Sequence, residues 1–210
     1  MVSLKNLIDG FKKFRKAHYA SNKTVFEKLA KSQKPNTLII ACSDSRVDPA
    51  ILSSSNLGEI FVVRNVANII PEYQSKQKSF DSTIAALEFA VNILPIKNII
   101  ILGHSGCAGV KSIVNYNNKL KNFKFLNYWL ENGQKIKNLI KKNKVKEIDL
   151  ESFSEKEMIK MSVNNVKKYP WIKKKMKNNQ IMVLGWYFNI KECALYQLDT
   201  KNNSFKKVKT

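Results

Sequence analysis

The chain has 210 residues, of which 44% are hydrophobic, and it carries a formal net charge of +21 at pH 7. That length and composition suit a single domain with a sizeable core. They exclude a membrane-spanning helix, since no apolar run reaches the roughly 18 residues that one needs. Three cysteines and a first segment without the apolar block of a secretory signal argue against a disulfide framework, so we expect a cytoplasmic protein.

The high positive charge raises the question of nucleic-acid binding. The lysines, however, are spread through nearly every predicted helix instead of being gathered in one stripe, and no nucleic-acid-binding motif accompanies them. We therefore expect no specific nucleic-acid partner and no membrane partner. Nonspecific adhesion to polyanions at low salt is the expected consequence of the charge.

Residues 1–34 are expected to form an N-terminal helical arm of two helices, the second over residues 25–31. Apolar side chains recur at helical spacing in the first helix: Leu4, Leu7, Ile8, Phe11 and Phe14. Pro35 ends the arm, and residues 35–210 are expected to form the main α/β part of a protein that is a single domain overall.

In residues 35–210, strand-like runs alternate with helical patterns, which predicts an α/β fold with a mostly parallel central sheet flanked by helices. About four parallel strands are expected, at 37–41, 59–63, 98–102 and 180–184, with an edge strand at 194–198. Helices are expected at 80–94, 108–116 and 155–169, with surface helices between 117 and 150. The polar residues from 201 onward are expected to be frayed.

Two of the predicted strands end in side chains that bind metals. Cys42 follows the first strand, and His104 and Cys107 follow the third. Because ligands gather beyond the carboxyl ends of strands in open α/β sheets, we expect the three side chains to converge. Two thiolates and one imidazole make a three-ligand Zn²⁺ set that leaves one coordination position open for chemistry. The sequence therefore predicts a zinc-dependent enzyme.

Asp44 and Arg46 lie next to the first ligand in Cys-Ser-Asp-Ser-Arg. Asp44 could take the fourth position on zinc, or it could pair with Arg46, which can hold a carboxylate through two parallel hydrogen bonds. Paired, Asp44 would leave that position to water and could accept the proton of the water. Zinc lowers the pKa of bound water toward neutrality, and the resulting hydroxide suits a small electrophile such as carbon dioxide.

Three segments together resemble the signature blocks of the β-class carbonic anhydrases. They are Cys-Ser-Asp-Ser-Arg at 42–46, Gly-Glu-Ile-Phe-Val-Val-Arg-Asn-Val-Ala-Asn at 58–68 and Gly-His-Ser-Gly-Cys at 103–107. The similarity extends to residues 86–91, 169–170 and 185–186, and so covers most of the chain from Gln33 onward. It implies reversible hydration of carbon dioxide to bicarbonate and a proton by zinc-bound hydroxide.

The resemblance also implies roles for individual residues. Cys42, His104 and Cys107 match the zinc ligands of the family, and Asp44 with Arg46 matches its catalytic dyad. The positions that match its substrate-binding residues are Gln33, Phe61, Val66, Phe89 and Ala108. Two of these depart from the common pattern, because Phe89 stands where plant-like members carry Tyr and Ala108 stands where Gly is common.

The family builds its carbon dioxide pocket across a dimer interface, with N-terminal helices around the partner, so the resemblance implies a homodimer or tetramer. Members with an inhibitory bicarbonate site carry Trp, Gly and Tyr where this chain has Ile39, Ala41 and Phe188. The chain is therefore similar to the plant-like, non-allosteric type. We expect it to lack the inhibitory site and to hold Asp44 on Arg46.

Two alternatives stay open. Related enzymes of the same architecture hydrolyse carbonyl sulfide or carbon disulfide, and the motif residues do not distinguish these substrates from carbon dioxide. A basic nucleic-acid-binding module with a structural zinc would instead close the fourth coordination position with a protein ligand.

Overall fold

The computed structural model describes residues 2–75, 81–115 and 122–209. The chain divides into two compact units, residues 1–34 and residues 35–210. No helix within the described ranges combines the length and the apolar character needed to cross a bilayer.

The first unit consists of α1 (Leu4–Phe14), a π-helical turn (Arg15–Tyr19) and α2 (Lys23–Lys31). The hydroxyl oxygen of Ser3 caps α1 by accepting the backbone N–H of Asn6 at 3.2 Å. Most apolar side chains of α1 are exposed, Leu4 by 74% and Phe11 by 63%. The sequence therefore forms an amphipathic helix whose apolar stripe is not buried within the described chain.

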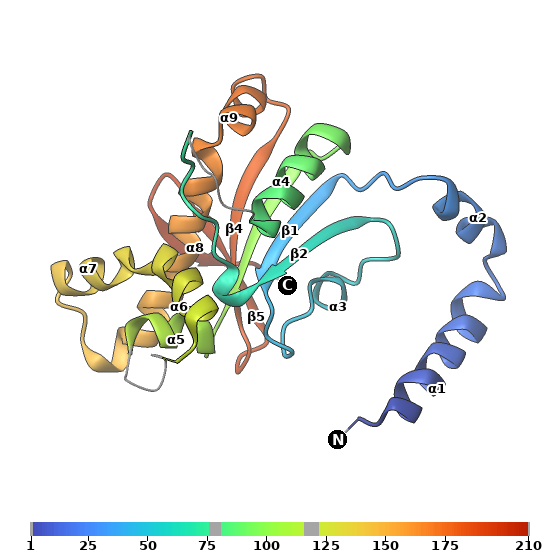
Figure 1. The fold of residues 1–210 in the computed structure, drawn as a ribbon, viewed down its shortest axis with the longest axis horizontal. Coiled ribbons are helices and arrows are strands. Elements are labelled where there is room, and N and C mark those ends of the chain that lie inside the picture. Colours follow the sequence, from blue (N-terminus) through green and yellow to red (C-terminus); the bar gives the residue numbers. More distant parts are fainter. Residues whose placement is uncertain (1, 76–80, 116–121, 210) are drawn as a thin grey trace. The chain divides into compact units, whose positions relative to one another are not determined.

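The second unit is built on a six-stranded sheet in the order β2-β1-β3-β4-β5-β6 (Figure 1). The parallel strands are β1 (Thr37–Cys42), β2 (Ile60–Asn65), β3 (Asn98–His104) and β4 (Met182–Asn189). β5 (Ala194–Asp199) and β6 (Ser204–Lys207) continue the sheet in antiparallel fashion. The register pairs Ala41 with Leu102, so β1 and β3 end at the same edge of the sheet.

One face of the sheet is covered by α4 (Ser82–Ile93), α8 (Leu150–Lys168) and α9 (Pro170–Lys177). Their buried apolar residues, Leu87, Ile159 and Ile172 among them, pack with Leu38 and Ile40 of β1. The side chains of β1 are buried from Leu38 to Cys42 on both faces of the sheet, as is typical of a central parallel strand.

The described residues of the second unit also form α3 (Pro49–Ser53), α5 (Ala108–Val114), α6 (Lys124–Leu130) and α7 (Lys135–Lys142). Short 3-10 turns at Val66–Asn68, Glu131–Gly133 and Glu147–Asp149 connect neighbouring elements. Val110 of α5, Ile136 of α7 and Met158 of α8 form a second core cluster with Cys42 and Cys107. The carboxyl ends of β1 and β3 are thus packed against α5, α7 and α8, which follow these strands in the chain.

The predicted fold class, an α/β fold with a mostly parallel sheet and flanking helices, is confirmed. The prediction of a frayed tail from residue 201 is wrong for Ser204–Lys207, which forms β6, so β5 is internal to the sheet. The ring of Phe205 packs 6.1 Å from that of Tyr187, centroid to centroid. A single apolar residue in a polar run has no period, so the sequence pattern did not predict this strand.

The helix boundaries also differ from the predicted ones. α8 begins at Leu150, five residues before the predicted start, and α9, which begins at Pro170 directly after the predicted helix at 155–169, was not predicted. Proline is favoured in the first turn of a helix, and here it begins one. Phe80 and Tyr116, predicted as helix ends, lie outside the described residues.

Candidate metal centre

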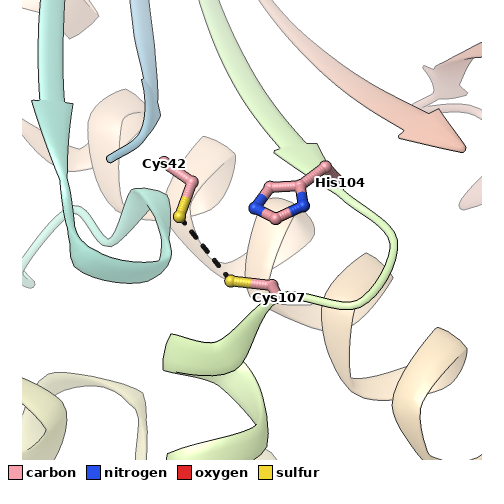
Figure 2. Close-up of side chains that lie close together, drawn as sticks. All are labelled: Cys42, His104 and Cys107. Carbon is pink, nitrogen blue, oxygen red and sulfur yellow. Dashed lines mark hydrogen bonds between the residues drawn. The ribbon is translucent and has the colours of Figure 1, made fainter. Parts of the chain in front are cut away.

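Three metal-binding side chains meet where β1 and β3 end. Cys42 is the last residue of β1, His104 is the last residue of β3, and Cys107 is the N-cap of α5. All three are buried, and their ligand atoms lie within 4.8 Å of one another. Figure 2 shows the imidazole beside the two sulfurs, which are 3.7 Å apart. The structure therefore brings together the three ligands that the sequence placed at two separate strand ends.

The imidazole of His104 is oriented for a ligand at its Nε2 atom. Nδ1 lies 3.0 Å from the carbonyl oxygen of Ser105, so a proton on Nδ1 is donated there and Nε2 keeps its lone pair. Nε2 is buried and has no hydrogen-bond partner among the described residues. A buried nitrogen without a partner is costly. A cation bound by this lone pair and the two sulfurs would remove that cost.

The two sulfurs form a hydrogen-bonded pair. The hydrogen bond from Cys107 lowers the pKa of Cys42, while the same bond and burial raise the pKa of Cys107. Two thiolates this close would repel each other unless a cation lay between them. Soft sulfur ligands with an imidazole suit a tetrahedral metal such as zinc. The donor set thus fits the predicted ion.

Asp44 is bound to Arg46 in a bidentate arrangement. Its Oδ1 accepts Nε–H of Arg46 at 2.9 Å, and its Oδ2 accepts Nη2–H at 2.7 Å. These hydrogen bonds hold the pKa of Asp44 well below its usual range. Oδ2 is also 3.8 Å from Nε2 of His104, so the carboxylate lies beside the three ligands. Nη2 of Arg46 donates to the carbonyl of Gly106 at 2.8 Å, which ties the two ligand-bearing turns together.

Arg64, which lies in the 58–68 block, supports the first turn. Its Nε donates to the carbonyl of Cys42 at 3.1 Å, and its Nη2 donates to the carbonyls of Asp44 and Val47 at 2.6 and 2.8 Å. The guanidinium thus binds the backbone on both sides of the dyad. Contacts between a side chain and a distant backbone leave no periodic signal, so only the position of Arg64 within a signature block could have indicated this role.

The predicted substrate-binding residues fall into separate groups. Phe61 and Phe89 are neighbours, with ring centroids 6.1 Å apart. Phe61 pairs with Leu38, four residues before Cys42, which places it about 13 Å along the sheet from that ligand.

Val66 lies instead just after β2, at the end of the sheet where Cys42 and Cys107 lie. A Cβ atom placed on Gly109 would come 2.7 Å from Cγ1 of Val66, so Val66 packs against the first turn of α5, which begins at Ala108. Gln33 belongs to the first unit, and its role stays a prediction.

The fold and the site together invite comparison with known proteins. Residues 37–195 match the family model described as carbonic anhydrase. Beta carbonic anhydrase 3 of Arabidopsis thaliana is 32% identical over 95% of this chain and 79% of its own length. The chain belongs to the β carbonic anhydrase family. The predicted family and the predicted enzyme class are thereby confirmed.

Further β carbonic anhydrases show the same similarity. The carbonic anhydrase of Helicobacter pylori is 30% identical over 95% of this chain and 92% of its own length. The solved structure of the β-carbonic anhydrase CcaA has a TM-score of 0.91 and 31% identity, and the match covers 99% of this chain and 92% of that one. A tetrameric β-carbonic anhydrase of Sordaria macrospora, at 23% identity and a TM-score of 0.80, shares the fold.

Proposed function

We propose that this member of the β carbonic anhydrase family catalyses the zinc-dependent, reversible hydration of carbon dioxide to bicarbonate and a proton. The observation that carries the proposal is the buried Nε2 atom of His104. It has no hydrogen-bond partner among the described residues and lies close to the sulfurs of Cys42 and Cys107. Cys42, His104 and Cys107 would hold the ion. When bound, zinc supplies a water that is acidic near neutral pH.

Asp44 and Arg46 would handle the proton. Both carboxylate oxygens accept hydrogen bonds from the guanidinium, so Asp44 stays ionised and turned toward Arg46. An ionised carboxylate with free lone pairs can accept the proton of a substrate water and release it to solvent. Its side chain is 14% exposed, which leaves a route for that release. This arrangement supports the expected non-allosteric type.

The carbon dioxide pocket is proposed to be shared between two copies of the chain. Phe61 lies too far along the sheet to reach the Cys42 of its own chain, whereas Val66 and Ala108 lie beside that chain's own ligands. A second copy would supply Gln33, Phe61 and Phe89. Phe89 is 43% exposed, as an interface residue in an isolated chain would be. A homodimer, or a tetramer built from dimers, would bury it.

The proposed location is the cytoplasm. The cysteines in the described residues are free, and the two in the metal centre must stay reduced to bind an ion. A reducing compartment provides that condition. Cell fractionation with antibodies against the native chain would test it.

The central experiment measures zinc content and carbon dioxide hydration on the same purified protein. We expect about one zinc per chain and stopped-flow activity that disappears when a chelator removes the metal. Turnover of carbonyl sulfide and carbon disulfide by the same sample would identify the preferred substrate. Full zinc occupancy without hydration of any of the three would contradict the proposal and favour a structural zinc.

A further inference from the structure

Helix α8 carries a line of buried polar side chains where a core helix would ordinarily be apolar. Glu155 is 4% exposed, Ser162 0% and Asn165 7%. Positions 155, 162 and 165 recur at the spacing of a single helix face. Burying polar groups costs free energy unless each finds a partner. The partners therefore show what this face of α8 supports.

The later residues of this line bind the backbone that follows β2. The hydroxyl of Ser162 donates to the carbonyl of Asn68 at 3.0 Å and accepts the N–H of Ile70 at 3.1 Å. Asn165 donates to the carbonyl of Ile70 at 2.8 Å. These bonds fix the path of the chain after the Val66–Asn68 turn.

Glu155 binds a different segment, the second ligand-bearing turn. One carboxylate oxygen accepts the backbone N–H of Cys107 at 3.0 Å, and the other accepts the hydroxyl of Tyr187 at 3.0 Å. The carboxylate is thus held at both oxygens, one toward β4 and one toward a metal ligand. None of the sequence motifs includes this residue.

The peptide group that Glu155 binds is also held from its other end. The N–H of Cys107 and the carbonyl of Gly106 belong to one planar peptide group. Glu155 accepts from the N–H, and Arg46 donates to the carbonyl at 2.8 Å. Gly106 has a φ of +67°, a region that glycine enters without strain, so the residue itself constrains this turn little. The two hydrogen bonds therefore set the orientation of the peptide.

We propose that Glu155 is a positioning residue that orients the peptide between Gly106 and Cys107. Through that peptide it aims the sulfur of Cys107 at the metal and presents the Gly106 carbonyl to Arg46 of the dyad. Its carboxylate thus links the metal ligand and the dyad through one backbone group. The inference rests on the proposed metal site, and it assigns to α8 a part in building that site.

The test compares metal binding in the full-length protein and three variants of α8. Glu155→Ala removes both hydrogen bonds. Glu155→Gln keeps the length of the side chain and one acceptor oxygen for the N–H of Cys107. Glu151→Gln is the matched control, since Glu151 also joins α8 to α5, through an exposed ion pair with Lys111 at 2.6 Å, and does not bind the peptide.

The readouts are zinc affinity by chelator competition and the sulfur-to-cobalt absorption band of the Co²⁺-loaded protein. For Glu155→Ala we expect metal affinity to fall about 10- to 100-fold, as for other groups that orient metal ligands, with an altered cobalt band. Glu155→Gln should retain affinity within about threefold and keep the band, and Glu151→Gln should match the parent protein. A purely structural role for Glu155 would lower the unfolding temperature of the metal-free protein without changing the band.

Equal zinc affinity and an identical cobalt band in Glu155→Ala and the parent would overturn the inference alone. A parent protein that binds no metal would overturn the proposed function, and this inference with it. If Glu155→Ala does not fold, Glu155→Asp replaces it, since its carboxylate is one methylene too short for the Cys107 N–H. Glu155→Asp should then show the loss of affinity, and unchanged affinity would count against the inference.

Discussion

The two turns next to the candidate metal ligands are held in different ways. The turn after β1 is fixed by two arginines near the surface, with side chains 52% exposed for Arg46 and 30% for Arg64. The turn after β3 shares one of these arginines, since Arg46 donates to the carbonyl of Gly106, but it is also held from inside by Glu155, which is 4% exposed. The first turn carries Asp44, the proposed proton acceptor, and the second lies between His104 and Cys107, two of the three candidate ligands. The proposed proton transfer therefore lies at the turn with exposed supports, and the turn with two candidate ligands has an additional buried one.

This comparison predicts that substituting a metal ligand has the largest effect on zinc binding and activity. The effect should be equal in both turns. Cys42→Ser in the first turn and Cys107→Ser in the second should each lose zinc and activity together. The loss should exceed the roughly 100-fold typical of groups that only orient a ligand. Metal analysis and stopped-flow hydration on the same samples check this. Cys193→Ser, which changes the exposed third cysteine, is the control and should keep both.

Asp44→Asn should lower activity without lowering metal binding, because it removes the proposed proton acceptor and leaves the ligands in place. We expect zinc content to stay at the parent level while the hydration rate falls about 10²- to 10⁴-fold, the range of general acid–base catalysis. The measurement is kcat by stopped flow, normalised to bound zinc. Full activity in this variant would refute the role given to Asp44.

Arg64→Ala should weaken the first turn without removing a ligand. Three carbonyls lose a charged donor, so the free energy of unfolding should fall by about 2 kcal/mol. Arg64→Lys should recover only part of this, because an ammonium cannot bind three carbonyls with the geometry of a guanidinium. Urea unfolding of the metal-free proteins gives both values, and equal stability of Arg64→Ala and the parent would contradict the assignment.

The smallest effect is expected at Glu72, which lies outside both turns and binds Lys135 and Lys168 at the surface. These lysines lower its pKa to about 2. A lowered pKa stabilises the folded state above the unfolded value of about 4.3, and that contribution disappears as the pH falls through about 2. Glu72→Gln should therefore be slightly less stable than the parent at pH 7, with the difference shrinking below pH 4 and in high salt. Its zinc affinity should not change.

The sequence was sufficient to predict the parallel strands and the convergence of Cys42, His104 and Cys107, because both have local signals. Leu38 to Ala41 and Ile99 to Leu102 are unbroken apolar runs, and cysteine and histidine at their ends are uncommon and chemically specific. The groups that hold the ligands have no such signal. Glu155 resembles any glutamate at the start of a helix, and its partner Cys107 is 48 residues away in the chain.

β6 was not predicted, for a related reason. Its only apolar residue is Phe205, and its pairing with β5 depends on contacts that form only once the sheet exists. Tertiary packing decides such segments, whereas local pattern decides β1 and β3. What could be predicted was therefore the family, the fold and the grouping of the three candidate ligands, and what could not were the side chains that bind distant backbone.

The separation of Phe61 from Cys42 along the sheet has a genetic consequence if two copies share the pocket as proposed. A chain with Cys42→Ser has no metal but still offers an intact Phe61 to its neighbour. A chain with Phe61→Ala keeps its metal but contributes an altered pocket wall to the site of its neighbour. Mixed dimers of the two would contain one fully wild-type site, so co-expression of two defective alleles would restore function that neither gives alone.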